Sequence, residues 1–120
     1  MNESRLPILL RDTPLLTTVK AAGDDGVAKT LCFGNILELE SDALLLESKR
    51  EFEIGVALIL NVVFPRVERG PKSVVSVGCV VVKVRDSIRL HYDLGIEDMD
   101  DEAHLQLAEF LSRRRFEKVG

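Results

Sequence analysis

The chain has 120 residues, of which 46% are hydrophobic and 30% are charged. This length and apolar content suit one domain that buries its core without a metal ion or a disulfide. The net charge of -4 at pH 7, together with only 5% aromatic residues and no tryptophan, argues against a protein that binds nucleic acid through its backbone or by base stacking.

The first 14 residues are interpreted as an extended lead-in to a domain that spans residues 15–120. They combine charged residues and two prolines with a short apolar patch, Ile8-Leu9-Leu10. They lack the apolar core and cleavage site of a signal peptide, and no stretch of the chain approaches about 18 consecutive apolar residues. We therefore expect a soluble, cytoplasmic protein without membrane insertion.

The domain begins with the pattern of a β-hairpin. Leu15 to Ala22 and Val27 to Glu40 are predicted to be strands, because β-branched and alternating residues dominate them. The tetrapeptide Gly23-Asp24-Asp25-Gly26 between them has the composition of a turn. Gly34 is predicted to be a bulge in the second strand.

Three further strands are predicted in the middle of the chain. Ser41-Asp42 forms a corner that leads into the apolar run Leu44 to Ser48. The segment Gly55 to Phe64 is almost entirely apolar and predicts a strand covered on both faces. The valine-rich segment Ser73 to Asp86 predicts another strand, with a bend at Gly78.

The last predicted strand runs from Ile88 to Glu97, where apolar and polar residues alternate. This alternation is typical of a half-buried antiparallel strand, with Ile88 on the inner face. Arg89, His91 and Asp93 are then expected on the outer, solvated face.

After Asp100 the apolar period changes to that of a helix. Acidic residues precede the apolar positions and Arg113 to Arg115 follow them, an order that suits the helix dipole at both ends. We expect a helix from about Asp100 to Arg115 that packs on the strands. Its predicted contact residues are Ala103, Leu107, Phe110 and Leu111. About six strands followed by one helix predict an all-β fold, an antiparallel β-barrel with a C-terminal helix.

No pattern in the chain predicts catalysis or metal binding. A nucleophile elbow, an HExxH helix and a phosphate-binding glycine loop are all missing, so the protein is not expected to be an enzyme. Cys32 and Cys79 form no CxxC pair and are expected to be small core residues. His91 is expected on the surface, and His104 at the border of the helix's apolar stripe.

Three passages resemble the PilZ domain family, the bacterial cyclic-di-GMP receptor modules. They are residues 38–47, Phe52-Glu53-Ile54-Gly55 with the strand after it, and Tyr92 to Glu97 leading into the helix. The resemblance covers roughly Leu15 to Leu111. It implies a PilZ-like antiparallel β-barrel of about six strands with one C-terminal α-helix.

The nucleotide-binding motifs of this family are altered here. The Asp, Ser and Gly of its DxSxxG turn fall on Glu38, Glu40 and Ala43, and its RxxxR element is matched by Arg11 with Leu15 in place of the second arginine. A cyclic dinucleotide presents two phosphates and guanine edges, which arginine forks bind well, whereas two added glutamates repel it. We expect no cofactor, with cyclic-di-GMP possible but disfavoured.

The resemblance with these altered motifs implies a non-catalytic regulatory or adaptor module of bacterial cyclic-di-GMP-related signalling that acts by protein-protein interaction. The partner is an unidentified protein or a second copy joined along an open edge strand. The expected contact surface combines Arg89, His91 and Asp93 with the loop Arg66 to Lys72.

Two alternatives stay open. In the first, the protein is a cyclic-di-GMP receptor that holds the nucleotide through an altered site near Arg11 and residues 38–43. In the second, it is a generic small β-barrel subunit of a larger assembly.

Overall fold

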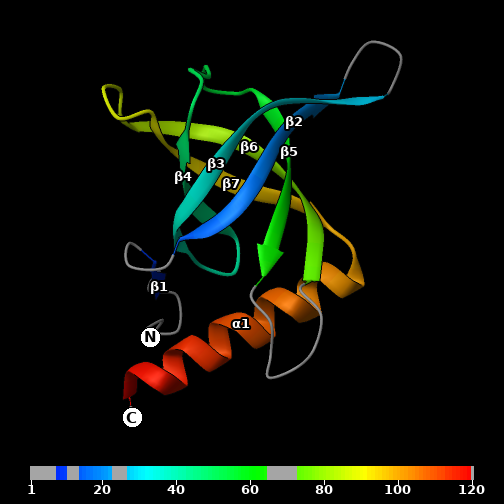
Figure 1. Ribbon diagram of the computed structural model, residues 1–120, viewed down its shortest axis with the longest axis vertical. Helices are drawn as coiled ribbons and strands as arrows, with labels where there is room; N and C mark the ends of the chain where they lie inside the picture. The colour runs from blue at the N-terminus through cyan, green and yellow to red at the C-terminus, as the bar shows by residue number, and fades with distance from the viewer. Residues whose placement is uncertain (1–7, 11–13, 23–26, 65–72, 120) are drawn as a thin grey trace.

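Six antiparallel strands pair in a closed ring, and one long helix follows them (Figure 1). The computed structural model describes residues 8–10, 14–22, 27–64 and 73–119. The predicted turn at 23–26, the loop 66–72 and Arg11 lie outside the described residues. The elements are β1 (Ile8–Leu9), β2 (Leu15–Ala22), β3 (Ala28–Leu39), β4 (Ala43–Ser48), β5 (Ala57–Phe64), β6 (Ser73–Asp86), β7 (His91–Met99) and α1 (Asp101–Val119).

The ring runs β3-β2-β5-β6-β7-β4 and closes because β3 also pairs with β4. This confirms the predicted barrel of about six strands. The short strand β1 pairs with the end of β3, where Ile8 lies opposite Leu39. Within the described part of the chain each barrel strand therefore has two neighbours in the ring, and a dimer along an open edge would have to use β1.

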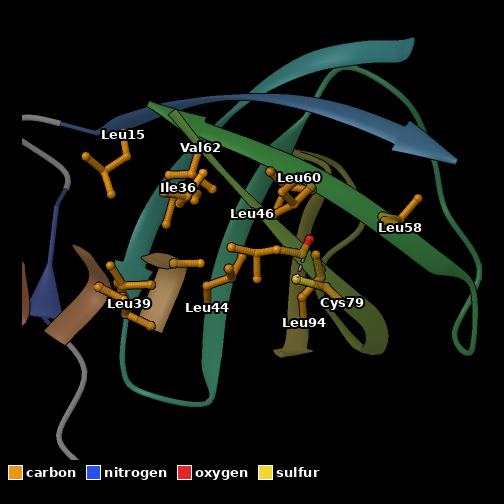
Figure 2. Packing of buried hydrophobic residues seen from close by; sticks show 14 of the residues in the cluster. Leu15, Ile36, Leu39, Leu44, Leu46, Leu58, Leu60, Val62, Cys79 and Leu94 are labelled. Carbon is orange, nitrogen blue, oxygen red and sulfur yellow. Dashed lines mark hydrogen bonds between the residues drawn. The ribbon is translucent and has the colours of Figure 1, made fainter. Parts of the chain in front are cut away.

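The core fills the barrel with alternate side chains from every strand of the ring. Figure 2 shows several of these side chains directed into the space between the strands. In β5 the burial alternates, with Leu58, Leu60, Val62 and Phe64 inside and the residues between them at least partly exposed. The prediction that this strand is covered on both faces is wrong, because a barrel wall has one buried face and its outer apolar residues meet solvent.

The strand predicted from Ile88 starts three residues later than expected. Residues 87–90 form a turn, and the Asp86 carboxylate accepts hydrogen bonds from the backbone N–H of Ile88 and Arg89 at 3.0 and 3.1 Å. Ile88 is 92% exposed, and His91 is only 5% exposed. Both predictions are wrong. Ile88 lies in the turn before the strand, and His91 is covered although it has the outward parity, opposite to that of the core residues Tyr92 and Leu94.

The two glycines predicted to interrupt strands behave differently. A register shift does occur next to Gly78, between Gly78 and Cys79. Gly34 instead lies in regular pairing with Thr17 and Ser48, and the irregularities of β3 fall elsewhere. The bulge predicted at Gly34 is therefore wrong. Glycine is needed at position 34 because the strands approach closely there. An added Cβ would lie 2.7 Å from the carbonyl oxygen of Glu47.

The helix α1 packs on one end of the barrel, as Figure 1 shows. Its backbone begins at an N-cap, because the Asp100 carboxylate accepts a 2.8 Å hydrogen bond from the N–H of Ala103. The rings of Phe110 and Phe64 pack with their centroids 5.3 Å apart. The predicted contact residues are confirmed as members of the core, and they are Ala103, Leu107, Phe110 and Leu111.

The two cysteines and His104 differ in burial. Cys79 belongs to the core and Cys32 packs against it, half-buried, as expected for small core residues. His104 is exposed. No helix among the described residues is long and apolar enough to cross a membrane.

Candidate functional site

A shallow pocket of about 80 Å³ lies where β3 turns into β4. The backbone folds tightly there, because the N–H of Glu40 donates a 2.9 Å hydrogen bond to the carbonyl of Ala43. Three of the altered motif positions, Glu38, Glu40 and Ala43, line this pocket together. The other lining residues come from β3, β4, β6 and β7, and they are Leu39, Leu44, Leu45, Arg85 and Asp93.

Arg85 reaches into this pocket from β6 and binds two carboxylates. Its Nη1 donates to Oε2 of Glu38 at 3.0 Å. Its Nε and Nη2 donate to the two carboxylate oxygens of Asp93 at 3.1 and 2.5 Å. The pair with Asp93 is a bidentate fork, the arrangement in which a guanidinium binds a carboxylate most specifically.

The strand register places this ion-pair network over a buried leucine. Leu45 lies opposite Glu38 on one side and opposite Asp93 on the other. The guanidinium that joins these two carboxylates therefore crosses the outer face of β4 above Leu45. Leu45 is 1% exposed, which is consistent with cover from the arginine side chain.

The electrostatic balance of the pocket is acidic. Among the described residues that line the pocket, three are acidic, Glu38, Glu40 and Asp93, and one is basic, Arg85. The hydrogen bonds from Arg85 to Asp93, followed by those to Glu38, raise the pKa of Arg85 above its ordinary value. The guanidinium thus stays charged. Asp93 binds its Nε and Nη2, and Glu38 binds its Nη1, so carboxylates of the same chain already occupy these donors.

Sequence comparison finds no relative, since no protein-family model and no curated protein matches the chain. Structure comparison does find similar folds. The PilZ domain of YcgR from Escherichia coli, solved with c-di-GMP, superimposes with a TM-score of 0.60 at 9% identity, over 98% of this chain and 95% of that one. This chain has a PilZ-like fold.

A second similar structure is that of the Bacillus subtilis inhibitor of motility, MotI/DgrA. It superimposes with a TM-score of 0.70 at 13% sequence identity. The match covers 98% of this chain and 53% of that protein. The PilZ-like domain therefore spans about half the length of MotI/DgrA.

The remaining altered motif position of the PilZ-like domain that the structure describes lies away from the pocket. Leu15 is 4% exposed and belongs to the barrel core, where Figure 2 shows it near Ile36 and Val62. An arginine with this orientation would place its charge among apolar side chains. Leu15 therefore belongs to the barrel core and does not line the pocket that holds Glu38, Glu40 and Ala43.

Sequence reasoning missed Arg85. The available signal is its place near the end of a valine-rich strand, where a positive side chain interrupts an apolar run. Its partner Glu38 is 47 residues away in the chain. Only the closure of the barrel brings Arg85, on a strand separated from β4 by β7, within reach of the β3–β4 corner, so the pairing could not be read from local patterns.

The predicted contact surface of Arg89, His91 and Asp93 is not one exposed face of the PilZ-like domain. His91 is buried, and its Nε2 donates to Oε2 of Glu47 at 3.0 Å. This hydrogen bond is the main cause of a lowered Glu47 pKa. Asp93 is bound to Arg85. Of the three, only Arg89 is largely exposed, at 73% of its side chain.

Proposed function

We propose that this PilZ-like domain is a non-catalytic regulatory module that has lost ordinary cyclic-di-GMP binding and acts through contacts with protein. The observation that carries the proposal is the ion-pair network of Arg85 with Glu38 and Asp93 at the altered motif positions. An anionic dinucleotide entering this pocket meets three carboxylates and an arginine that is already bound.

The energetic cost of this arrangement is large enough to abolish binding. A hydrogen bond to a charged group contributes about 1.5 to 3 kcal/mol. Loss of two such bonds moves a micromolar ligand, at about -8 kcal/mol, into the millimolar range. Freeing Arg85 for a phosphate would also leave Glu38 and Asp93 without this partner.

The structural neighbours support a role in cyclic-di-GMP-related signalling. One is a PilZ domain solved with c-di-GMP, and the other is named an inhibitor of motility. A regulatory module of this type would act in the cytoplasm. The free thiols of Cys32 and Cys79 suit a reducing compartment, in which disulfides are rare.

Titration of cyclic-di-GMP by calorimetry tests the loss of binding, with the YcgR PilZ domain as the positive control. We expect no saturable binding to the wild-type chain at submillimolar nucleotide. Micromolar binding would contradict the proposal and favour the alternative of a receptor with an altered site. Amide chemical shifts recorded in the same titration would then locate that site.

A partial reconstruction of the motif gives a second arm of the test. The triple variant Glu38→Asp, Glu40→Ser, Ala43→Gly removes one negative charge and restores a flexible turn. We expect it to bind cyclic-di-GMP more tightly than the parent. Leu15→Arg is left out because it would bury a guanidinium. A folded triple variant with no gain in affinity would mean that these positions do not correspond to the family's turn.

A further inference from the structure

One row of residues crosses the outer face of the barrel with an uneven distribution of charge and bulk. Lys20 lies opposite Ile59, Ile59 opposite Gly78, and Gly78 opposite Asp98. Val19, Leu58, Val77 and Cys79, the sequence neighbours of the first three, are core residues, so Lys20, Ile59 and Gly78 face outward. Asp98 is exposed and lies on the same side, because its Cβ is 3.1 Å from the position of a Cβ added at Gly78. Across β2, β5, β6 and β7 the row presents a cation, an apolar branched side chain, a gap and an anion.

These four residues line the same surface depression, which has a volume of about 470 Å³. Gly78 accounts for its depth because no side chain stands between Ile59 and Asp98. The row spans three inter-strand spacings, roughly 14 Å. The depression is thus wide and shallow, with positive charge at one side and negative charge at the other.

The centre of this surface, on β5 and the paired part of β6, is uncharged, whereas Asp98 and Asp100 line the depression at the β7 side. The outward residues of β5 and of the part of β6 that pairs with it, up to Val80, are Ala57, Ile59, Asn61, Val63, Val74, Ser76, Gly78 and Val80. None of these eight carries a charge, in a chain in which 30% of residues do. Depletion of charge in the centre with charges at the rim is the composition of a protein interface.

The row is complementary to itself under a two-fold rotation. The two-fold axis lies in the plane of the interface, perpendicular to the row, and passes midway between Ile59 and Gly78. Rotation about it places each end of the row against the other end in the second copy. Lys20 then faces the partner's Asp98, and Ile59 faces the gap at the partner's Gly78. Both contacts occur twice, as in every interface of two identical surfaces.

We propose that the outer face of β2, β5, β6 and β7 binds a second copy of this chain about this axis. The charge pairs at the two sides set the orientation, since a rotation that brings Lys20 onto the partner's Lys20 is repulsive. Ile59 fills the depression of the partner. The proposal does not depend on the motif pocket, because Glu38, Arg85 and Asp93 lie outside this row.

Two single charge reversals test the proposal. In Lys20→Glu, residue 20 meets the partner's Asp98 with like charge, and in Asp98→Lys, residue 98 meets the partner's Lys20 with like charge. Each variant alone is expected to weaken dimerisation roughly 100-fold or more, because like charges placed together cost several kcal/mol. An equal mixture of the two variants restores both ion pairs and is expected to form a heterodimer.

Analytical ultracentrifugation over a concentration series measures these masses. The wild-type chain should approach twice its 13.4 kDa, each variant alone should remain at the monomer mass, and the mixture should return to the dimer mass. Lys49→Glu and Asp42→Lys are matched reversals at exposed positions away from the row, and each should dimerise like the wild type. Circular dichroism checks that every variant is folded.

Three results would overturn the proposal. They are a wild-type chain that stays monomeric at all concentrations, single variants that dimerise as well as the wild type, and a mixture that stays monomeric although both variants are folded. None of them would bear on cyclic-di-GMP binding, which the calorimetric titration measures separately.

Discussion

Single side chains set how closely the strands of this barrel approach and what covers them. Arg85 covers the outer face of Leu45 and joins β6 to β3 through Glu38. Gly34 has the opposite effect, because it leaves space for its neighbours. It pairs with both Thr17 and Ser48, so its missing side chain lets three strands meet.

Gly34→Ala is expected to destabilise the fold by about 1 to 3 kcal/mol, the usual cost of forcing extra volume into a packed site. The new methyl group would lie 2.7 Å from the backbone oxygen of Glu47 and 3.0 Å from Cδ1 of Leu46. A backbone atom cannot move aside as the end of a flexible side chain can. Urea denaturation gives the change in the free energy of unfolding.

Gly95→Ala is the matched control for this substitution. A Cβ at Gly95 would lie 3.6 Å from Cγ1 of Val82, an ordinary contact. The free energy of unfolding should change by less than about 0.5 kcal/mol. Equal effects of the two substitutions would show that Gly34 is not needed for close approach.

At the scale of elements, the sequence predicted the kinds and order of the six barrel strands and the helix correctly, because each depends on local periodicity, but it did not predict the two-residue strand β1. The helix contact residues Ala103, Leu107, Phe110 and Leu111 follow from a spacing of three and four residues. Burial was harder to predict than strand parity. Tyr92 and Leu94 face the core as the alternation predicts, but His91 on the opposite face is buried beside Glu47, which is 44 residues away in the chain.

The helix is also the element whose packing is simplest to test. Leu107 is 6% exposed and Leu105 on the same helix is 61% exposed. Leu107→Ala should lower the free energy of unfolding by about 2 to 5 kcal/mol, the range for a truncated core leucine. Leu105→Ala makes the same chemical change on the solvent side and should have little effect. Denaturant melts that show under about 1 kcal/mol for Leu107→Ala would mean that α1 does not contribute to the core.

At the scale of the whole molecule, closure of the barrel joins segments that are far apart in the sequence. The pairing of β4 with both β3 and β7 brings the altered motif positions to Arg85 and brings Glu47 to His91. The sequence predicted that Glu38, Glu40 and Ala43 form one site, since they are close in the chain. It could not predict Arg85 or the buried position of Leu15, which depend on strand order and register.

The Glu47–His91 pair makes the stability of the whole barrel depend on pH in the acid range. The hydrogen bond from His91 is the main reason that the pKa of Glu47 lies below 4.5, and burial opposes it. The charges of His91 and Lys49 and a hydrogen bond from Asn35 lower it further. The unfolded chain therefore takes up a proton at Glu47 at a higher pH than the folded chain does.

The sign of the effect follows from this difference in proton binding. Where the unfolded state binds more protons, stability rises with pH. The contribution of Glu47 is fully present above pH 4.5 and is lost as the pH falls through the lowered pKa of the folded state. The difference in unfolding free energy between the wild type and Glu47→Gln should shrink as the pH falls below about pH 5.

Urea melts between neutral pH and about pH 3 measure this difference. Glu51→Gln removes a carboxylate from an exposed position and leaves the contact with His91 intact, so it controls for the loss of one negative charge. Asp86 also has a lowered pKa, chiefly because its carboxylate accepts hydrogen bonds from the backbone N–H of Arg89 and Ile88. It changes stability with pH in the same direction as Glu47, but it is present in all three proteins and cancels when they are compared. A stability difference for Glu47→Gln that stays unchanged down to pH 3 would show that the bond to His91 does not stabilise the ionised carboxylate.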